Sequence, residues 1–499
     1  MTRFFEAVPV ALTPLTPIHV GCGEDFEPTN YVIDGGVLYE FDAARVALTE
    51  SERDRLLSAV NREGDEAIRA VQSFFFEKRR SCIEKSWLRV PVAPAVDNWY
   101  RSRIGKVAQR ESSGRTVSNQ LVIERTARHP HTGKPYLPGT SLKGSIRTAW
   151  LNHIDPTPLI ARDPNNPPPR EERSADVEKE LLGGEFFCDP FRLVKVADAA
   201  GEQVVSRVLF CVNRARDQMD PSADQRFEKN LFVVREVIVG GQYRALTGEI
   251  RLDHLPNVAG DGVPARERRI RSFEQLARAC NGFYLPRFRH ELDLLRRRFG
   301  NDQWIGRVEK LLTELNVDFE AGRSMLIRVG RHSGAECVTL DKRRWIQIKG
   351  GKRRPTHWSR EATTIWLAAE RQDENRELIP FGWLLIERLP SETKEALSAW
   401  CMDEASRLRA PSTAPQPSPL AQKAREEIWK GARLRFNRAN GTLTAVGTGQ
   451  IEAHALRPRG EELLGSLPPE IQEKVRRNEF VRVTARVVGR ELISISYSG

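Results

Sequence analysis

The chain has 499 residues, of which 40% are hydrophobic, and its 78 lysines and arginines against 67 acidic residues give a net charge of +11. This length exceeds one hydrophobic core, so we expect two or three domains. The seven cysteines never form a Cys-x-x-Cys pair, which argues against a zinc knuckle and a disulfide scaffold, and no segment has the roughly 20 apolar residues that span a bilayer. A soluble, cytoplasmic protein is therefore predicted, with a charge that suits a polyanionic partner.

The N-terminal region carries the residue patterns of a unit rich in β-strands. Residues 7–18 read as a strand and lead into a tight turn that carries Gly21 and Gly23. Residues 31–41 form two β-rich runs around an Asp-Gly-Gly turn, and residues 48–80 carry helical apolar stripes. This order predicts a ferredoxin-like α+β unit.

His19 stands at the start of that turn and has two interpretations. Imidazole titrates near neutral pH, so His19 could serve as a general base in RNA cleavage. Alternatively, its ring nitrogens bond nearby backbone. The sequence offers no convincing acid partner for His19, which favours the structural role.

Residues 98–133 form a basic stretch with few apolar anchors near its middle. It predicts either a loop that orders on RNA or a solvated loop, and the sequence does not separate the two. Its cations are Arg101, Arg103, Lys106, Arg110, Arg115, Arg125 and Arg128.

Residues 134–147 predict an extended approach, a sharp turn at Gly139 and an amphipathic helix capped by Thr140 or Ser141. Lys143 and Arg147 lie four residues apart, on one face of its first two turns. Free N–H groups at a helix N-terminus together with two cations predict an anion site, most plausibly for phosphate. The alternative is an ordinary capped helix with a solvated basic face.

Residues 191–252 contain further strand patterns, and residues 273–315 form a helical block with a predicted break near Gly282–Pro286. A second strand-to-glycine turn follows at residues 324–334. There, glycine lets main-chain N–H groups approach a ligand, and arginine supplies charge. The residues concerned are Arg328, Gly330, Arg331 and Gly334.

The densest basic region spans residues 343–358, where Trp345 and Trp358 alternate with cations. Basic residues for phosphates and aromatic rings for stacking are typical of single-stranded RNA binding, although a surface hairpin without that function would look similar. The cations chosen as candidates are Arg343, Arg344, Lys352 and Arg353.

A proline-rich segment marks a linker over residues 406–422. Beyond it, two strand pairs, one around Asn440-Gly441, predict a small β-barrel-like module over residues 423–499. Its sequence does not reveal its role.

Two motifs resemble a known family. Pro138 to Arg147 (PGTSLKGSIR) resembles the glycine-rich signature of the CRISPR-associated RAMP proteins. Leu12 to Asp25, followed by the Tyr-Val-Ile-Asp strand at residues 31–34, resembles the N-terminus of the fifth Csm-series subunit of type III-A effector complexes. The resemblance implies an α+β fold of tandem ferredoxin-like, RRM-like RAMP domains with helical insertions, over residues 1–162 and 176–405.

The same resemblance implies a non-catalytic guide-RNA-binding subunit in antiviral defence, which caps the complex at the crRNA 3′ end and supports crRNA maturation. Its implied partners are crRNA, target RNA, neighbouring backbone and small subunits of the complex, and host nucleases, with no cofactor or metal. We take the glycine turns and the basic stretches as candidate RNA contacts: His19, Gly21, Gly23, Arg125, Gly139, Thr140, Ser141, Lys143, Gly144, Arg147, Arg328, Gly330, Arg331, Gly334, Arg343, Arg344, Lys352 and Arg353.

Three other functions stay open. The chain could be a RAMP endoribonuclease that processes or slices RNA, although Asp25 and Asp34, its N-terminal candidates, stand in no carboxylate cluster. It could be a sister RAMP subunit of a variant type III complex. It could also be a protein scaffold that makes no RNA contact.

Overall fold

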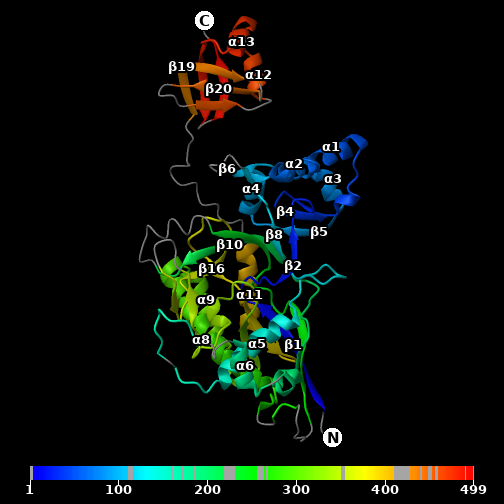
Figure 1. The fold of residues 1–499 in the computed structure, drawn as a ribbon, viewed down its shortest axis with the longest axis vertical. Helices are drawn as coiled ribbons and strands as arrows, with labels where there is room; N and C mark the ends of the chain where they lie inside the picture. Colours follow the sequence, from blue (N-terminus) through cyan, green and yellow to red (C-terminus); the bar gives the residue numbers. More distant parts are fainter. Residues whose placement is uncertain are drawn as a thin grey trace. The chain divides into compact units, whose positions relative to one another are not determined.

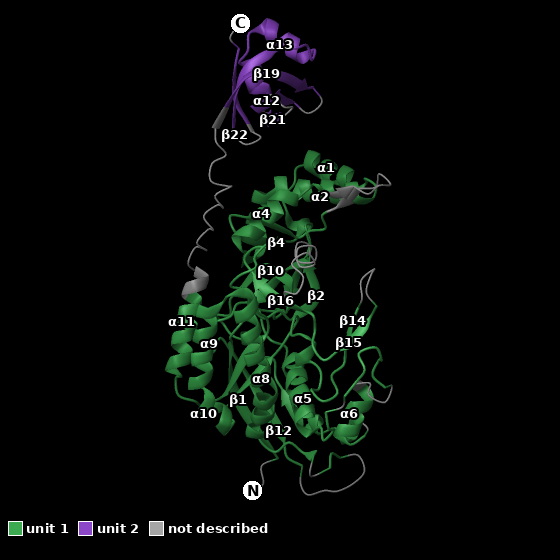
Figure 2. Cartoon of the chain, turned by 90° about the vertical axis from the view of Figure 1, so that its left-hand side faces the viewer, with its two compact units in different colours: residues 1–407 green, residues 408–499 purple. Residues whose placement is uncertain are grey.

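The computed structural model divides the chain into two compact units, residues 1–407 and 408–499 (Figure 2). The division lies inside the segment predicted as a linker. The residues described are 4–110, 116–159, 161–169, 174–184, 186–217, 231–255, 263–265, 268–349, 355–409, 426–438, 441–447, 452–455, 459–488 and 491–497.

A five-stranded sheet forms the base of unit 1 (Figure 1). Its central strand β1 (Phe5–Pro14) pairs antiparallel with β12 (Leu246–Asp253) and β18 (Trp383–Arg388). The edge strands are β13 (Ser324–Arg328) and β9 (Val194–Val196). Nearly every residue of β1 from its middle onward is buried, as expected for a strand covered on both faces.

A six-stranded sheet forms the second layer. Its strand order is β17 (Ile379–Pro380), β16 (Thr364–Ala369), β10 (Ser206–Ala215), β11 (Phe232–Ile238), β8 (Ile123–Thr126) and β2 (Gly21–Phe26). Because β1 pairs with β12 and β18, and β8 pairs with β11, strands before residue 162 join strands after residue 176, and the two predicted halves share both sheets. The predicted α+β class is confirmed.

Helices cover the five-stranded sheet, and the longest of them corrects a prediction. Helix α8 (Phe273–Phe299) runs unbroken through Pro286, where the sequence predicted a break. Tyr284 and Phe288 flank Pro286 and pack against Trp383 of β18, and burial of these rings counteracts the roughly 3 kcal/mol that an internal proline costs. Helix α8 packs against α5 (Gly139–Ile154), α9 (Asp302–Glu314) and α10 (Asn316–Ala321), and α6 (Ser174–Leu182) packs against α5. Helix α11 (Glu395–Arg409) follows β18 in the chain.

A smaller layer extends from the edge of the six-stranded sheet (Figure 1). The predicted hairpin at residues 31–41 is present in its three-stranded sheet, and the predicted helical stretch at residues 48–80 is divided into separate helices. The strands are β3 (Tyr31–Asp34), β4 (Val37–Phe41) and β5 (Ser86–Pro91), and the helices are α1 (Glu50–Val60), α2 (Gly64–Glu77), α3 (Arg79–Glu84) and α4 (Pro94–Arg103). Two short hairpins complete unit 1: β6 (Val107–Arg110) with β7 (Thr116–Ser118), and β14 (Ile346–Ile348) with β15 (His357–Ser359).

Unit 2 is a closed five-stranded barrel, which confirms the predicted β-rich module. It has its own hydrophobic core, to which Leu434, Leu443 and Val475 belong. Its elements in chain order are β19 (Glu426–Asn437), β20 (Thr442–Val446), β21 (Glu452–Ala455), α12 (Arg459–Gly465), α13 (Pro469–Arg476), β22 (Arg482–Val488) and β23 (Glu491–Ser496). No helix within the described part of the chain is long and apolar enough to cross a membrane.

Candidate nucleic-acid interface

Two glycine turns that the sequence predicted separately meet in the structure. The backbone N–H of Arg331 donates to the carbonyl oxygen of His19 at 2.8 Å. Gly330 adopts a φ of +87°, and a Cβ at this position would overlap that same carbonyl. Glycine is therefore required at Gly330 both by its backbone conformation and by the close approach of the two turns.

The joined turns border a groove of about 680 Å³, which we call the turn groove. Gly21 and Gly23 line one side of it, Trp99 and Arg103 come from α4, and Arg331 comes from the second turn. Gly23 has a φ of +81°, and a Cβ added there would meet no atom within 4 Å, so its backbone faces open space. Exposed main-chain amides beside arginine and tryptophan can bind a phosphate and stack a base.

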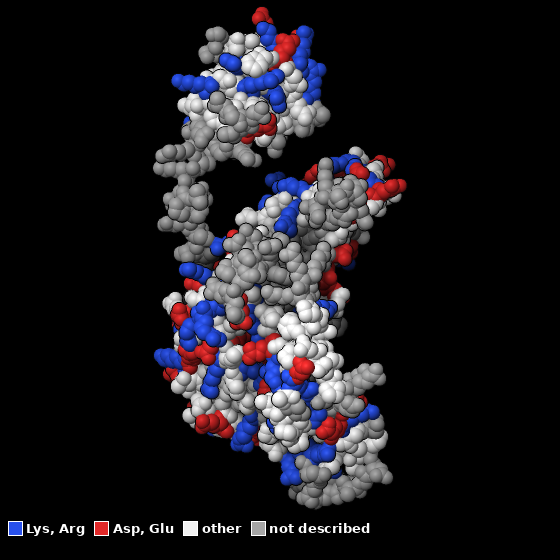
Figure 3. Space-filling model, turned by 60° about the vertical axis from the view of Figure 1, so that its left-hand side comes forward, with Lys and Arg blue, Asp and Glu red and all other residues white. Residues whose placement is uncertain are grey.

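Aromatic rings form the floor of the turn groove near α4. The Arg103 guanidinium lies 5.6 Å from the Trp99 ring and 5.7 Å from the Phe232 ring. Glu24, Asp25 and Glu124 also line the groove, so its charge is mixed. Lysine, arginine and acidic side chains are likewise interspersed over the face of unit 1 in Figure 3. Open backbone and aromatic rings, rather than bulk charge, distinguish this groove.

Arg125 contributes to a wall of the groove rather than to its open surface. Its side chain is 11% exposed, and its guanidinium lies 5.3 Å from the rings of both Phe26 and Trp87. It pairs with Glu40 at 3.1 Å and with Glu24 at 3.4 Å. Burial raises the pKa of Glu40 to about 7 although Arg125 opposes the shift.

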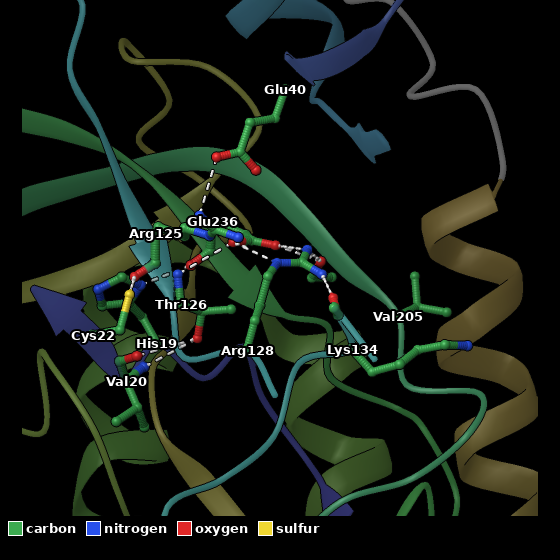
Figure 4. A network of polar contacts seen from close by, with 12 residues as sticks. His19, Val20, Cys22, Glu40, Arg125, Thr126, Arg128, Lys134, Val205 and Glu236 are labelled. Atoms are coloured by element: carbon green, nitrogen blue, oxygen red, sulfur yellow. Dashed lines mark hydrogen bonds and ion pairs between the residues drawn. The ribbon is translucent and has the colours of Figure 1, made fainter. Parts of the chain in front are cut away.

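A buried polar network holds the strands behind the groove (Figure 4). The Glu236 carboxylate accepts hydrogen bonds from the Arg128 guanidinium, from the Ser206 hydroxyl at 2.7 Å and from the Thr126 backbone N–H at 3.2 Å. The carbonyl oxygen of Glu236 lies 2.7 Å from Nδ1 of His19. Glu236 thus links β8, β10 and β11 to the first turn.

His19 is a structural residue in this arrangement. Its side chain is fully buried, and because a carbonyl can only accept, Nδ1 must carry the proton. Burial lowers the pKa of His19 to about 4, and burial also lowers the pKa of His332 to about 3. Both rings are therefore neutral near pH 7, and the backbone contact of His19 fits the structural interpretation.

We expect the free energy of unfolding to fall when the pH drops from 6.5 to 5. In this window the unfolded chain protonates both histidines whereas the folded chain keeps them neutral, so acid favours unfolding by up to about 1.4 kcal/mol per pH unit and histidine. Glu40 works in the opposite direction, because its stabilising contribution is present below pH 4.5 and is lost as the pH rises through 7. Urea unfolding at several pH values measures this dependence. As the pH drops from 6.5 to 5, the free energy of unfolding should fall more steeply for Glu40→Gln than for the natural chain. A free energy of unfolding that does not change with pH in that variant would contradict the neutral state assigned to the two histidines.

The glycine-rich loop at α5 makes intramolecular contacts in place of an open anion site. The Asp198 carboxylate accepts from the Gly139 N–H at 2.7 Å, so a carboxylate of this chain occupies the helix N-terminus. A Cβ at Gly139 would overlap the carbonyl oxygen of Val196. Lys143 donates to two carbonyl oxygens, those of Phe191 and Val194, at 2.8 Å each, and burial lowers its pKa.

The other candidate residues of the glycine-rich loop differ in how far they are exposed to solvent. Arg147 pairs with Glu178 at 2.8 Å and Asp189 at 2.7 Å and lies over the ring of Phe191. Thr140 and Gly144 are exposed, whereas Ser141 is half-buried. The predicted phosphate site at Lys143 and Arg147 therefore has its cations engaged inside unit 1.

Replacing Arg147 by alanine is expected to lower the free energy of unfolding by about 1–3 kcal/mol, because two carboxylates lose a charged donor. Urea unfolding measures the change. Arg192→Ala is the matched control, since this exposed arginine lies over the exposed ring of Phe186 and should cost less than about 1 kcal/mol. Equal losses in both variants would contradict the structural role of Arg147.

The second turn and the basic hairpin also hold engaged arginines. Arg328 is buried, with Glu291 at 2.9 Å and the Trp383 ring at 5.0 Å, so it packs inside the protein. Arg343 pairs with Asp155 at 3.2 Å, and Arg344 donates to the Arg360 carbonyl at 2.6 Å. Gly334 has a φ of +75° beside Glu336. Lys352 and Arg353 lie outside the described residues.

The structure thus brings together six predicted residues around the turn groove: His19, Gly21, Gly23, Arg125, Gly330 and Arg331. It adds Trp99 and Phe232, which were not chosen from the sequence, and Arg103, which the sequence named only as a cation of the basic stretch at residues 98–133. Trp99 and Arg103 are four residues apart, so they lie on one face of the helix at residues 94–103. Recognising that helix in the sequence would have predicted that the two side chains are neighbours. Among the residues that the structure describes, no three histidine, cysteine or acidic side chains gather in a metal-binding group.

Comparison with known proteins decides the family. The RAMP superfamily model matches residues 11–330, a range that includes the first glycine turn and the loop at α5 and ends at Gly330 within the second turn. The chain belongs to the RAMP superfamily. This assignment supports the interpretation of the two sheets as tandem ferredoxin-like RAMP domains.

Individual relatives and solved structures are similar to this chain. The chain is 22% identical over 315 residues to the CRISPR system protein Csm5 of Methanocaldococcus jannaschii, a match that covers 61% of this RAMP chain and 66% of that protein. A crystal structure of Csm5 from T. onnurineus aligns over 75% of the chain and 99% of its own length, with 17% identity and a TM-score of 0.41. A chain of a Csm–crRNA–target RNA complex aligns over 77% and 100%, with 15% identity and a TM-score of 0.43. This RAMP chain is similar in sequence to the Csm5 protein of Methanocaldococcus jannaschii.

Proposed function

We propose that this chain is a non-catalytic guide-RNA-binding subunit of a type III CRISPR effector ribonucleoprotein. It caps the complex at the crRNA 3′ end and supports crRNA maturation. The observation that carries the proposal is the junction of the two glycine turns through His19 and Arg331, which lies beside a groove that offers open backbone and aromatic rings. The matched RAMP range includes the first turn and reaches Gly330 of the second.

The proposed binding mode assigns a role to each kind of group. The exposed Arg331 binds a phosphate, the open backbone at Gly21–Gly23 follows the sugar-phosphate chain, and Trp99 with Phe232 stacks a base. Thr140 and Gly144 offer a second contact on the exposed surface of α5. The partners under this proposal are crRNA, target RNA, the neighbouring complex subunits and host nucleases.

The non-catalytic part of the proposal draws support from the state of His19. A general base must reach the proton that it abstracts and must have a pKa near the working pH. His19 is fully buried, and its pKa is lowered to about 4. Its contacts serve the turn junction instead.

Substitution of Arg331 by glutamine tests RNA binding in the turn groove. We expect affinity for single-stranded RNA to fall several-fold and the slope of log affinity against log salt to shrink by about 0.7, the value for one phosphate contact. Arg45→Gln removes an equal charge from a side chain that is 80% exposed and outside the groove, and it should change neither quantity. Unchanged binding by the Arg331 variant would remove this residue from the interface.

Crosslinking with ultraviolet light in the native complex tests the position along the guide. Crosslinks from the Gly330 turn to the 3′ portion of mature guides support the capping role. Crosslinks to the repeat-derived end would assign a different RAMP position. A complex in which no guide RNA crosslinks would favour the scaffold interpretation.

A further inference from the structure

The topology of unit 2 is that of an oligonucleotide- and oligosaccharide-binding barrel. Its five strands close in the order β19-β20-β21-β23-β22, and both helices lie between the third and fourth strands in the chain. In barrels of this type the ligand lies across the second and third strands and the neighbouring loops. A fold alone does not fix a ligand, so the surface at that position must decide.

A basic hollow of about 890 Å³ reaches one residue of each of these two strands from the neighbouring first strand, and we call it the arginine hollow. Thr444 of β20 and Glu452 of β21 belong to its lining, together with the second half of β19 and the end of α13. Among the described residues that line it, Glu452 is the one acidic side chain. The arginines are Arg433, Arg435, Arg438, Arg476 and Arg477. In Figure 3, blue side chains spread over the visible face of unit 2.

Few of these arginines are neutralised by strong ion pairs. Arg435 lies 3.8 Å from Glu452, and Arg477 pairs with Glu473 at 3.0 Å, but all four side chains are about half exposed or more. Exposed pairs of this kind contribute little and can exchange for a ligand phosphate. Arg438 donates to the neutral Arg476 carbonyl at 2.9 Å, a contact that orients its guanidinium without an opposite charge.

An exposed aromatic ring adjoins the hollow. Phe480 is 61% exposed, and the guanidinium groups of Arg433 and Arg482 lie 5.0 Å and 5.2 Å from its ring. An exposed phenyl ring costs solvation free energy, whereas a ring flanked by cations is a platform on which a base can stack. Several phosphate-binding arginines beside one stacking ring match a single strand better than a neutral sugar or a rigid duplex.

We propose that unit 2 is a second nucleic-acid-binding module, which binds single-stranded RNA or DNA through the arginine hollow and Phe480. The site is separate from the turn groove, and the proposal does not depend on the function proposed for unit 1. The barrel strands present the arginines, and the Phe480 ring stacks one base.

Photocrosslinking of the full chain to 10-nucleotide RNA and DNA of the same sequence tests the proposal, with the crosslinked peptides mapped by mass spectrometry. We expect crosslinks from residues 426–497 to the RNA, to the DNA or to both. The ratio of the two crosslinking yields shows whether unit 2 prefers RNA or DNA. A double-stranded competitor should displace the single strand poorly. Absence of crosslinks to residues 426–497, or equal competition by duplex, would overturn the proposal.

Variants separate the hollow from general charge. Arg433→Gln combined with Arg435→Gln should lower crosslinking to unit 2 at least about tenfold, and Phe480→Ala at least about fivefold. Arg486→Gln removes an equal charge from an exposed position on β22 outside the hollow, and it should have no effect. Far-ultraviolet circular dichroism confirms that each variant is folded. An equal loss in the Arg486 variant would reduce the interaction to non-specific attraction and overturn the assignment.

Discussion

Gly330→Ala is expected to disrupt the junction of the two glycine turns. The φ of +87° is strained for alanine, and the new methyl group would overlap the carbonyl oxygen of His19. Together these effects should lower the free energy of unfolding by about 2–4 kcal/mol. The folded fraction should lose RNA affinity by about tenfold or more, because displacement of Arg331 also disturbs the groove wall. Urea unfolding and RNA titration measure the two effects.

Alanine substitutions at two other glycines are controls with smaller expected effects on the free energy of unfolding. Gly144 lies within α5 with no atom within 4 Å of a Cβ position, so Gly144→Ala should be neutral or stabilise by up to about 1 kcal/mol. Gly23 has open space but a φ of +81°, so Gly23→Ala should show backbone strain alone, about 1–2 kcal/mol. If Gly330→Ala cost no more than Gly23→Ala, the close approach of the turns would lose its importance.

Glu236→Ala should have the largest effect on stability. The Glu236 side chain is fully buried, and its loss leaves the nearly buried guanidinium of Arg128 without its carboxylate. Breaking one side of a buried ion pair costs about 3–5 kcal/mol. The hydrogen bonds from Ser206 and from the Thr126 N–H disappear as well. Urea unfolding should therefore show a strongly reduced midpoint.

A double substitution distinguishes an unpaired charge from a simple cavity. Glu236→Met with Arg128→Met removes both charges and fills similar volume, so it should recover a large part of the loss. Glu66→Ala, which breaks the exposed pair with Arg62, should cost under about 1 kcal/mol. A loss under about 1 kcal/mol for Glu236→Ala would show that the network does not hold the sheet.

The turn groove shows how far the residues themselves could predict a site. Both glycine turns were recognisable, because glycine in a strand-to-turn pattern has few other uses. That Arg331 donates to His19 was not recognisable, since backbone contacts between distant segments leave no local pattern. Phe232 was missed for the same reason. The spacing of Trp99 and Arg103 indicates one face of a helix, but only the fold brings that face and the strand of Phe232 to one groove.

The basic residues show most clearly which properties follow from the sequence and which follow only from the tertiary structure. Sequence determined that unit 1 is an α+β protein with RAMP motifs and that a β-rich module follows a proline-rich segment, because alternation, turn residues and breakers act over a few positions. Only the tertiary structure decided that Lys143 meets two carbonyl oxygens, that Arg147 meets Asp189 and that Arg328 is buried beside Glu291. A cation binds RNA or stabilises the fold according to which distant acceptors the packing brings to it, and the free energy of burying that charge depends on the completed core.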